Sequence, residues 1–314
     1  MPEPILMFEP LLEPIQSRLE AQYQVYKVGD PAVDARAGDI RVVISGGATG
    51  MGSEWFDRLP NLGLIALNGV GTDKVDLDRA ASRRIHVTTT PGVLTADVAD
   101  LGMALILSSL RLMGQGERLV RGGGWSAGAS LPLARSLAGK RLGIVGLGAI
   151  GEAIGRRAGA FSMEVGFWSR SHKEVEGWTR QDSVLALADW ADVLAVAVAA
   201  TPETLGLVDA DVLRALGPDG LIVNVARGSV IDEPALLDAL ERRTIAGAGL
   251  DVFLNEPRID PRFLALENVF LMPHQGSATV ETRTAMAQTV ADNVAAFLAG
   301  EEPPTSVTAA RFAE

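Results

Sequence analysis

The stretch from Arg141 to Gly151, RLGIVGLGAIG, decides the fold class of this chain. An apolar run reaches a turn of the form GxGxxG, and an Ala/Ile/Arg-rich segment with helical periodicity follows from about Ile150. In such a turn the glycines permit a tight bend, close approach of a pyrophosphate, and close packing of helix on strand, while the helix N-terminus offers N–H groups to phosphates. We therefore expect a dinucleotide-binding loop, made of Gly146, Gly148, Ala149, Ile150 and Gly151. The alternative is a plain tight turn between a strand and a helix.

Short apolar runs alternate with helical patterns on both sides of this loop, which is typical of parallel strands joined by crossover helices. We expect strands in 5–8, 23–28, 42–45 and 64–67 before the loop, and in 165–168, 193–198, 221–226, 246–252 and 269–273 after it. Helices are expected over 11–20, 183–190 and 281–300, and from residues 150, 210 and 233. The fold class predicted is α/β, with two Rossmann-like, doubly wound parallel sheets.

Composition limits the classes of function. The chain has 314 residues with 47% hydrophobic and 21% charged, and 28 Lys plus Arg against 39 Asp plus Glu give a net charge of −11. Such a charge repels nucleic acid and anionic lipid, and no apolar run reaches the ~20 residues that span a bilayer. Without cysteine there is no disulfide and no thiolate zinc site, so we predict no metal. The acidic, proline-containing start does not resemble a secretory signal, and we expect a cytoplasmic protein.

A segment that is apolar nearly all round, residues 95–113, separates the two series of strands. Thr95 is a plausible N-cap, with Asp97 and Asp100 near the positive end of the helix dipole. A helix with so little polar surface must be buried, and we expect it between domains or between subunits. The later helix over 281–300 has no strand of its own to cover, so we expect it to return to the first domain.

The strand after the glycine loop ends in FWSRSHK, residues 167–173. An NAD site needs an acid about 20 residues after the loop for the ribose hydroxyls, and this strand end has none. Ser169, Arg170 and Ser171 are instead suited to a 2′-phosphate, and a charge-assisted hydrogen bond contributes about 1.5–3 kcal/mol. This corresponds to roughly one to two orders of magnitude in affinity, so we predict NADP(H) in preference to NAD(H). The alternative is a solvated basic loop.

Three successive strand ends in the second series carry groups suited to carbonyl reduction. Arg227 follows the strand at 221–226, Glu256 follows the strand at 246–252, and His274 follows the strand at 269–273. Reduction of a 2-oxo acid needs a hydride donor, an acid for the carbonyl oxygen and a cation for the carboxylate. We assign the acid to His274, the cation to Arg227 and the orientation of the imidazole to Glu256. Taken singly, these residues could be a surface ion pair and a capping histidine. The other two histidines fit structural or loop positions, His86 at the start of a strand and His172 in the FWSRSHK loop.

At these residues the chain resembles the D-isomer-specific 2-hydroxyacid dehydrogenase family. The matching stretches are GVGTDKVDL (69–77), TPGVLTADVAD (90–100), LAGKRLGIVGLGAIG (137–151), residues 223–232, residues 249–257 and PHQGS (273–277). The resemblance is greatest to the glyoxylate/hydroxypyruvate reductases, including hydroxyphenylpyruvate reductases, in which a WSR-like or NSR-like strand end accompanies NADPH.

The resemblance implies roles for further residues. It makes Arg227, Glu256 and His274 the catalytic set, and it places the substrate carboxylate on the backbone of Val70 and Gly71. The cofactor would be contacted by Thr95, Val225, Ala226, Asp251 and Gly276, with Asp251 on the nicotinamide side. The family fold implies a catalytic domain of residues 1–95 and 280–314, a nucleotide domain of residues 96–279 inserted into it, and a homodimer held through the helix after Thr95.

The activity predicted is NADPH-dependent reduction of glyoxylate, hydroxypyruvate and larger phenylpyruvate-type 2-oxo acids to D-2-hydroxy acids. Alternatives are a nucleotide-sensing corepressor of the same fold and another family dehydrogenase such as D-3-phosphoglycerate dehydrogenase. Formate dehydrogenase relatives pair the histidine with Gln, so Glu256 argues against them. The loop from Ser45 to Met51 is unusually small and offers no obvious pocket side chain, so substrate size does not follow from it. Gln275 stands where an apolar residue is more common.

Overall fold

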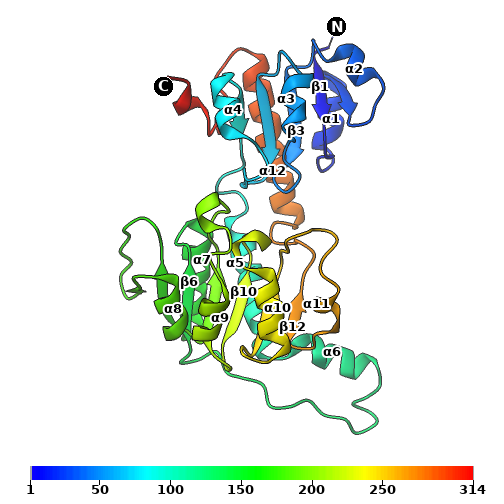
Figure 1. Ribbon diagram of the computed structural model, residues 1–314. Helices are drawn as coiled ribbons and strands as arrows, with labels where there is room; N and C mark the ends of the chain where they lie inside the picture. Colours follow the sequence, from blue (N-terminus) through cyan, green and yellow to red (C-terminus); the bar gives the residue numbers. More distant parts are fainter. Residues whose placement is uncertain (1, 314) are drawn as a thin grey trace. The chain divides into compact units, whose positions relative to one another are not determined.

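A computed structural model of the chain, which describes residues 2–313, contains two compact units. Unit 1 consists of Met1–Leu94 with Ala278–Glu314, and unit 2 of Thr95–Ser277. Each unit has its own parallel sheet with helices packed against it (Figure 1). The α/β class with two Rossmann-like sheets is therefore confirmed. The predicted domain limits at 95/96 and 279/280, and the roles given to the two domains, stay predictions.

Unit 1 has a five-stranded sheet in the order β2-β1-β3-β4-β5, parallel throughout. The strands are β1 (Pro4–Met7), β2 (Gln24–Lys27), β3 (Val42–Gly46), β4 (Leu64–Asn68) and β5 (His86–Thr88). The helices are α1 (Ile15–Gln22), α2 (Ala32–Arg36), α3 (Glu54–Arg58), α4 (Leu77–Ser82) and α12 (Val280–Leu298). The chain passes from β1 to β2 on one side and then returns to β3 on the other. The gap between β1 and β3 is thus the switch point of the sheet, where open α/β sheets bind ligands.

Unit 2 has a seven-stranded parallel sheet in the order β12-β11-β10-β9-β6-β7-β8. The strands are β6 (Arg141–Val145), β7 (Glu164–Trp168), β8 (Thr179–Arg180), β9 (Val193–Val196), β10 (Leu221–Asn224), β11 (Gly247–Leu250) and β12 (Val269–Leu271). The helices are α5 (Thr95–Leu110), α6 (Met113–Arg121), α7 (Ala149–Ala160), α8 (Val184–Trp190), α9 (Ala210–Leu216), α10 (Glu233–Glu241) and α11 (Arg262–Ala265). Its switch point lies between β6 and β9, beside the glycine loop.

The apolar helix α5 packs against α7 and against β10, β11 and β12 within unit 2. Small residues let it approach closely, because a Cβ on Gly249 of β11 would lie 3.0 Å from Leu105 Cβ. The sheet that α5 covers accounts for part of its apolar character, and its expected place between domains or between subunits stays a prediction. Thr95 is the first residue of the helix and not its N-cap, and Asp100 accepts a hydrogen bond from Arg157 of α7.

Helix α12 returns to unit 1, as expected, where it packs against β4 and α1. Helix α1 begins at Ile15 and not at residue 11, because Pro14 fits only at the start of a helix. The helices α2, α3, α4, α6 and α11 and the two-residue strand β8 were not predicted. Except for α6, which has nine residues, these elements have six residues or fewer and show too few positions for a periodic pattern.

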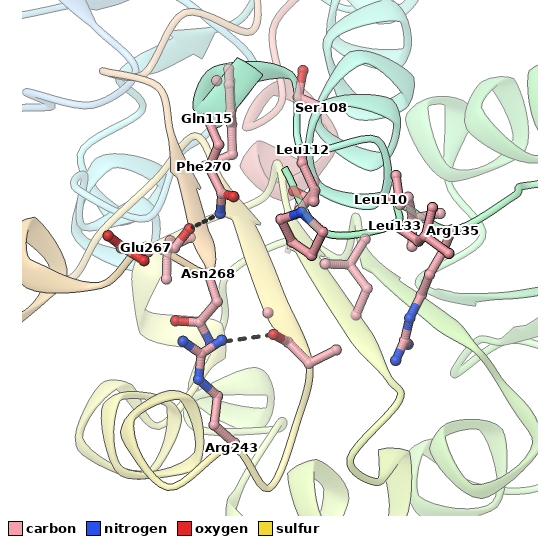
Figure 2. A pocket seen from close by; sticks show the side chains of 18 of the residues that line it. Ser108, Leu110, Leu112, Gln115, Leu133, Arg135, Arg243, Glu267, Asn268 and Phe270 are labelled. Atoms are coloured by element: carbon pink, nitrogen blue, oxygen red, sulfur yellow. Dashed lines mark hydrogen bonds between the residues drawn. The ribbon is translucent and has the colours of Figure 1, made fainter. Parts of the chain in front are cut away.

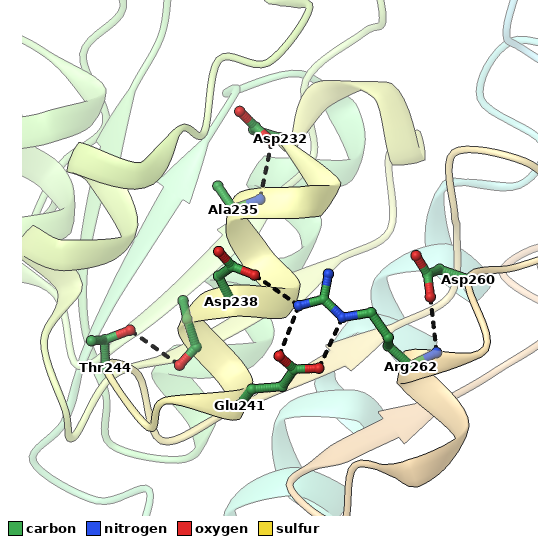
Figure 3. Close-up of polar contacts among 8 residues, drawn as sticks. Asp232, Ala235, Asp238, Glu241, Thr244, Asp260 and Arg262 are labelled. Carbon is green, nitrogen blue, oxygen red and sulfur yellow. Dashed lines mark hydrogen bonds and ion pairs between the residues drawn. The ribbon is translucent and has the colours of Figure 1, made fainter.

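The connection after β11 is tied to α10 by one guanidinium (Figure 3). Arg262 of α11 donates to Glu241 over 2.8 Å and to Asp238 over 2.7 Å, and its backbone N–H donates to Asp260. These hydrogen bonds raise the pKa of Arg262 and lower the pKa values of the two carboxyl partners. The cap of α10 is Asp232, whose side chain accepts from the N–H of Ala235. The segment between β11 and α11 is therefore anchored at its far end.

Candidate active site

Glycine occupies each of the three positions of the GxGxxG turn for a separate structural reason. Gly146 has a φ of +97°, which favours glycine, and a Cβ there would lie 2.7 Å from Val198. A Cβ on Gly151 would overlap the carbonyl oxygen of Gly146, so helix and strand approach there as predicted. Gly148 has open space around its Cα and precedes Ala149, the first residue of α7. An accessible backbone at a helix N-terminus fits a dinucleotide pyrophosphate.

The loop after β7 lies beside the glycine turn. Lys173 donates a hydrogen bond to the carbonyl of Leu147, which ties the two loops together. Arg170 is exposed. Hydrogen bonds from Thr201 and from its own backbone lower the pKa of Glu203, and the positive charge of Arg170 adds to this effect. Ser169 is buried and its hydroxyl donates to the carbonyl of Ser171 over 2.7 Å. Ser169 thus shapes the loop, and Arg170 and Ser171 are exposed to solvent, while the contact of this strand end with a 2′-phosphate stays a prediction.

Arg227, Glu256 and His274 follow three neighbouring strands of the unit 2 sheet, β10, β11 and β12. Glu256 accepts a hydrogen bond from Nδ1 of His274 over 2.6 Å and from the backbone N–H of Phe253 over 2.8 Å. Burial raises the pKa of Glu256, but the hydrogen bonds from His274 and Phe253 and the charge of Arg227 lower it overall. A carboxylate that stays ionised keeps the Nδ1 proton in place, so Nε2 is available for a reacting group. The structure thus brings together the three groups that the sequence singled out.

Asp251 holds the loop that carries His274. Its backbone carbonyl accepts from the N–H of His274 over 2.9 Å, and its two carboxylate oxygens accept from the N–H groups of Gln275 and Gly276 over 2.6 and 2.9 Å. Burial raises the pKa of Asp251, which is 2% exposed, and the two backbone hydrogen bonds oppose that rise. In this structure Asp251 is a positioning residue for the histidine loop. The contact of Asp251 with the nicotinamide side of the cofactor stays a prediction, and so does the contact of Gly276 with the cofactor.

Sequence reasoning missed three residues that position the catalytic groups. Asn224 is 1% exposed and bonds both the N–H of Ala226 and the carbonyl of Arg227, so it shapes the turn that presents the arginine. Buried Glu233 accepts from the N–H of Leu254 over 2.9 Å, and burial raises its pKa. A Cβ on Gly228 would overlap the backbone of Phe253 and Leu254. An Asn at a strand end and an Asp-Glu helix start are too common to have indicated these roles.

The remaining predicted contact residues lie where the chain order requires. Val225 and Ala226 are buried directly after β10, and Thr95 begins α5. Val70 and Gly71 follow β4 in unit 1, where Val70 is 40% exposed. His86 lies in β5, with its Nδ1 3.0 Å from the hydroxyl of Ser306 and its ring against Phe312, which agrees with a structural position.

A cavity of about 350 Å³ lies at the opposite edge of the unit 2 sheet, where the strands begin (Figure 2). Its lining includes Leu221 and Gly247, the first residues of β10 and β11, together with Leu133 and Gln115, and Gln115 donates to the carbonyl of Glu267. Catalytic groups in open α/β sheets lie at the carboxyl ends of the strands. This cavity is therefore separate from the Arg227, Glu256 and His274 cluster.

Comparison with known proteins agrees with this arrangement. Residues 103–276 match the model of the D-isomer specific 2-hydroxyacid dehydrogenase NAD binding domain. The chain belongs to the D-isomer-specific 2-hydroxyacid dehydrogenase family. A 2-ketogluconate reductase of Gluconobacter oxydans is 46% identical over 295 residues, which are 93% of this chain and 94% of that protein. A hydroxyphenylpyruvate reductase of Plectranthus scutellarioides is 40% identical over 308 residues, or 96% and 98% of the two chains.

A solved structure extends the similarity over the fold. The NADPH-dependent glyoxylate/hydroxypyruvate reductase of Sinorhizobium meliloti, in complex with NADP and malonate, superposes with a TM-score of 0.91 at 39% identity. The match covers 99% of this chain and 98% of that one. This dehydrogenase is thus an oxidoreductase of the 2-hydroxyacid class with an NAD-binding domain. Among residues 2–313, no helix is long and apolar enough to cross a membrane, and no cluster of three or more His, Asp or Glu could hold a metal ion.

Proposed function

We propose that this dehydrogenase reduces glyoxylate, hydroxypyruvate and phenylpyruvate-type 2-oxo acids to D-2-hydroxy acids with NADPH. The observation that carries the proposal is the His274–Glu256 hydrogen bond of 2.6 Å beside the cation Arg227, on three adjacent strand ends of the unit with the glycine loop. Reductases with glyoxylate, hydroxypyruvate or hydroxyphenylpyruvate in their names are among the relatives.

The three residues divide the work of carbonyl reduction. The bound nicotinamide supplies the hydride to C2 of the 2-oxo acid. His274 donates the Nε2 proton to the carbonyl oxygen, and ionised Glu256 stabilises the imidazolium before this transfer. Arg227 offers a planar fork of N–H donors to the substrate carboxylate and polarises the carbonyl beside it. The family resemblance assigns a contact with the substrate carboxylate to the backbone of Val70 and Gly71.

The preference for NADP(H) is part of the proposal. It is supported by exposed Arg170, by the tie between Lys173 and Leu147, and by the lack of an acid between Phe167 and Lys173. The relative crystallised with NADP provides a precedent within the family.

The experiment is a substrate panel at fixed NADPH, followed by absorbance at the nicotinamide band. Glyoxylate, hydroxypyruvate and phenylpyruvate should be reduced, and His274→Ala should lose turnover by about 10²–10⁴-fold while still binding NADPH. Because His274 has a φ of +54°, His274→Asn is the better-matched variant, since asparagine tolerates this conformation. Unchanged kcat in both variants would refute the role of His274.

The same assay separates the alternatives. A nucleotide-sensing corepressor binds NADPH without steady oxidation, whereas the reductase turns over. A D-3-phosphoglycerate dehydrogenase prefers a phosphorylated acid, which a panel including 3-phosphohydroxypyruvate reveals. The Glu256–His274 pair favours the reductase over the sensor, because binding alone does not need an oriented proton donor.

We also infer a homodimer formed through the region after Thr95. Support comes from the exposed apolar side chains that follow α5: Met113, Val120, Trp125, Leu131 and Leu133. Leu133 is 100% exposed. Large exposed apolar side chains that gather in one segment mark an interaction surface. Light scattering of the wild type and of Leu133→Asp tests this inference, since the variant should shift toward the monomer.

A further inference from the structure

We propose that Glu9 binds a hydroxyl group of a polyhydroxylated 2-oxo acid, so that the substrate class extends to sugar-derived acids. The proposal rests on the reductase activity proposed above and names a specificity-determining site for it. All the residues that carry it belong to unit 1.

Glu9 lies at the switch point of the unit 1 sheet. It follows β1 by two residues, and Phe8 extends the pairing with β3 by donating its N–H to the carbonyl of Ile44. In open α/β sheets the crevice at the switch point, outside the carboxyl ends of the strands, is where ligands bind. Glu9 is therefore placed by the topology at the ligand-binding edge of its sheet.

Gly46, the last residue of β3, provides the space for the Glu9 side chain. A Cβ on Gly46 would overlap the carboxyl group of Glu9. The next residue, Gly47, approaches the loop after β4, since a Cβ there would lie 3.3 Å from the carbonyl oxygen of Gly71. Glu9, Gly46, Gly47 and Gly71 thus form a continuous row. The loop from Ser45 to Met51 has no pocket side chain of its own, and its glycines leave room for the side chain of Glu9, which follows β1.

The charges around Glu9 suit a hydroxyl group. Arg283, near the start of α12, acts on Glu9 electrostatically and lowers its pKa, although burial has the larger effect and raises it overall. Within residues 2–313, the Glu9 carboxyl group has no hydrogen bond and forms no ion pair with Arg283. A hydroxyl group both donates and accepts, so it can donate to the carboxylate and accept from the guanidinium. A second carboxylate on the substrate would instead be repelled by Glu9.

The distance between Glu9 and the Val70–Gly71 backbone sets the length of the substrate that Glu9 can contact. Neighbouring strands lie about 4.8 Å apart, so Glu9 over β3 is on the order of 5–10 Å from the Val70–Gly71 backbone after β4. A two-carbon acid held by its carboxylate at Val70 and Gly71 ends before Glu9. A six-carbon acid can span this distance. A 2-ketogluconate reductase is among the relatives of this chain, which agrees with such a substrate.

The experiment compares kcat/KM for 2-ketogluconate and for glyoxylate with NADPH. Glu9→Gln keeps the shape of the side chain and removes its charge, so kcat/KM for 2-ketogluconate should fall by about 10- to 100-fold while that for glyoxylate stays within twofold. Gly46→Ala should reproduce the effect because the new methyl group displaces the Glu9 carboxyl group. Glu20→Gln, which removes an exposed carboxylate of α1, is the matched control and should change neither value.

Three results would overturn the proposal: a wild-type enzyme that does not reduce 2-ketogluconate, equal losses for both substrates, or no loss for either. If the wild type reduces no 2-oxo acid at all, the proposed function fails instead. Calorimetry with D-gluconate and NADP⁺ then tests Glu9 without turnover, and weaker gluconate binding in Glu9→Gln supports its role while equal binding refutes it.

Discussion

At the residue scale, His274, the proposed proton donor, occupies an uncommon backbone conformation. His274 has a φ of +54°, which costs a residue with a bulky side chain on the order of 1–3 kcal/mol. Hydrogen bonds from His274, Gln275 and Gly276 to Asp251 hold the loop in place. The hydrogen bonds to Asp251 therefore stabilise a conformation in which the imidazole donates to Glu256.

Glu256→Gln tests the electrostatic part of the histidine pair. Because the pKa of Glu256 lies below its ordinary value of 4.5, the carboxylate stays charged as pH falls to that value, and its own titration should not limit activity above about pH 4.5. In Glu256→Gln the imidazole loses its anionic partner and the carboxylate that fixes the proton on Nδ1. We expect kcat at pH 7 to fall by about 10- to 100-fold, measured by steady-state kinetics. An unchanged kcat would contradict this prediction.

Arg170→Ala tests the assignment of the 2′-phosphate site. Only NADPH offers a 2′-phosphate that the exposed guanidinium can pair with, so the KM for NADPH should rise about 10- to 100-fold and the KM for NADH should change little. Steady-state kinetics with both cofactors measures this difference. Arg180→Ala is a control that removes an exposed cation of β8. Equal effects on both cofactors would mean that Arg170 does not touch the 2′-phosphate.

At the scale of elements, the loop after β11 is positioned by the turn after β10. Gly228 leaves room for the backbone of Phe253 and Leu254, and Glu233 at the start of α10 binds the N–H of Leu254. The segment that carries Glu256 is thus held against the segment that carries Arg227. Two strand ends are coupled by backbone contacts that involve neither catalytic side chain.

Gly228→Ala should weaken this coupling. The added methyl group must push the Phe253–Leu254 backbone away, which costs roughly 1–3 kcal/mol of unfolding free energy and displaces Glu256. Urea unfolding and kcat measure the two effects. Gly159→Ala in α7, where a Cβ meets nothing within 4 Å, is the matched control and should leave both unchanged or slightly raise stability. Full activity in Gly228→Ala would show that the loop tolerates the shift.

Strand positions and the glycine turn were predictable because periodicity and turn chemistry are local. The runs at 5–8, 42–45, 64–67 and 165–168 lie in or over β1, β3, β4 and β7, and the α7 helix begins within one residue of the expected position. The helices α2, α3, α4 and α11 were not predictable, because four to six residues show no period. The packing of α5 on its own sheet did not follow from the sequence for a different reason: an apolar helix that covers a parallel sheet and one that lies at an interface have the same pattern.

At the scale of the whole molecule, the two units have separate sheets and only unit 2 carries the glycine loop. NADPH should therefore stabilise unit 2. At about 100 times its Kd, a ligand that binds only the folded state adds about 2.7 kcal/mol to the free energy of unfolding. Calorimetric unfolding with and without NADPH measures this gain. His274→Asn should retain it and Arg170→Ala should lose part of it at the same NADPH concentration. No shift in any unfolding transition would argue against cofactor binding.

The amino-acid sequence by itself predicted the α/β class, the dinucleotide turn and Arg227, Glu256 and His274 as candidate site residues. This was possible because strand ends and glycine turns are formed by residues that are adjacent in the chain. Only the tertiary structure decided that Asp251 binds the histidine loop and that the Glu9 side chain lies over Gly46. These contacts join residues from different strands and helices. Their partners are chosen by the order of strands in the sheets, and no local pattern encodes that order.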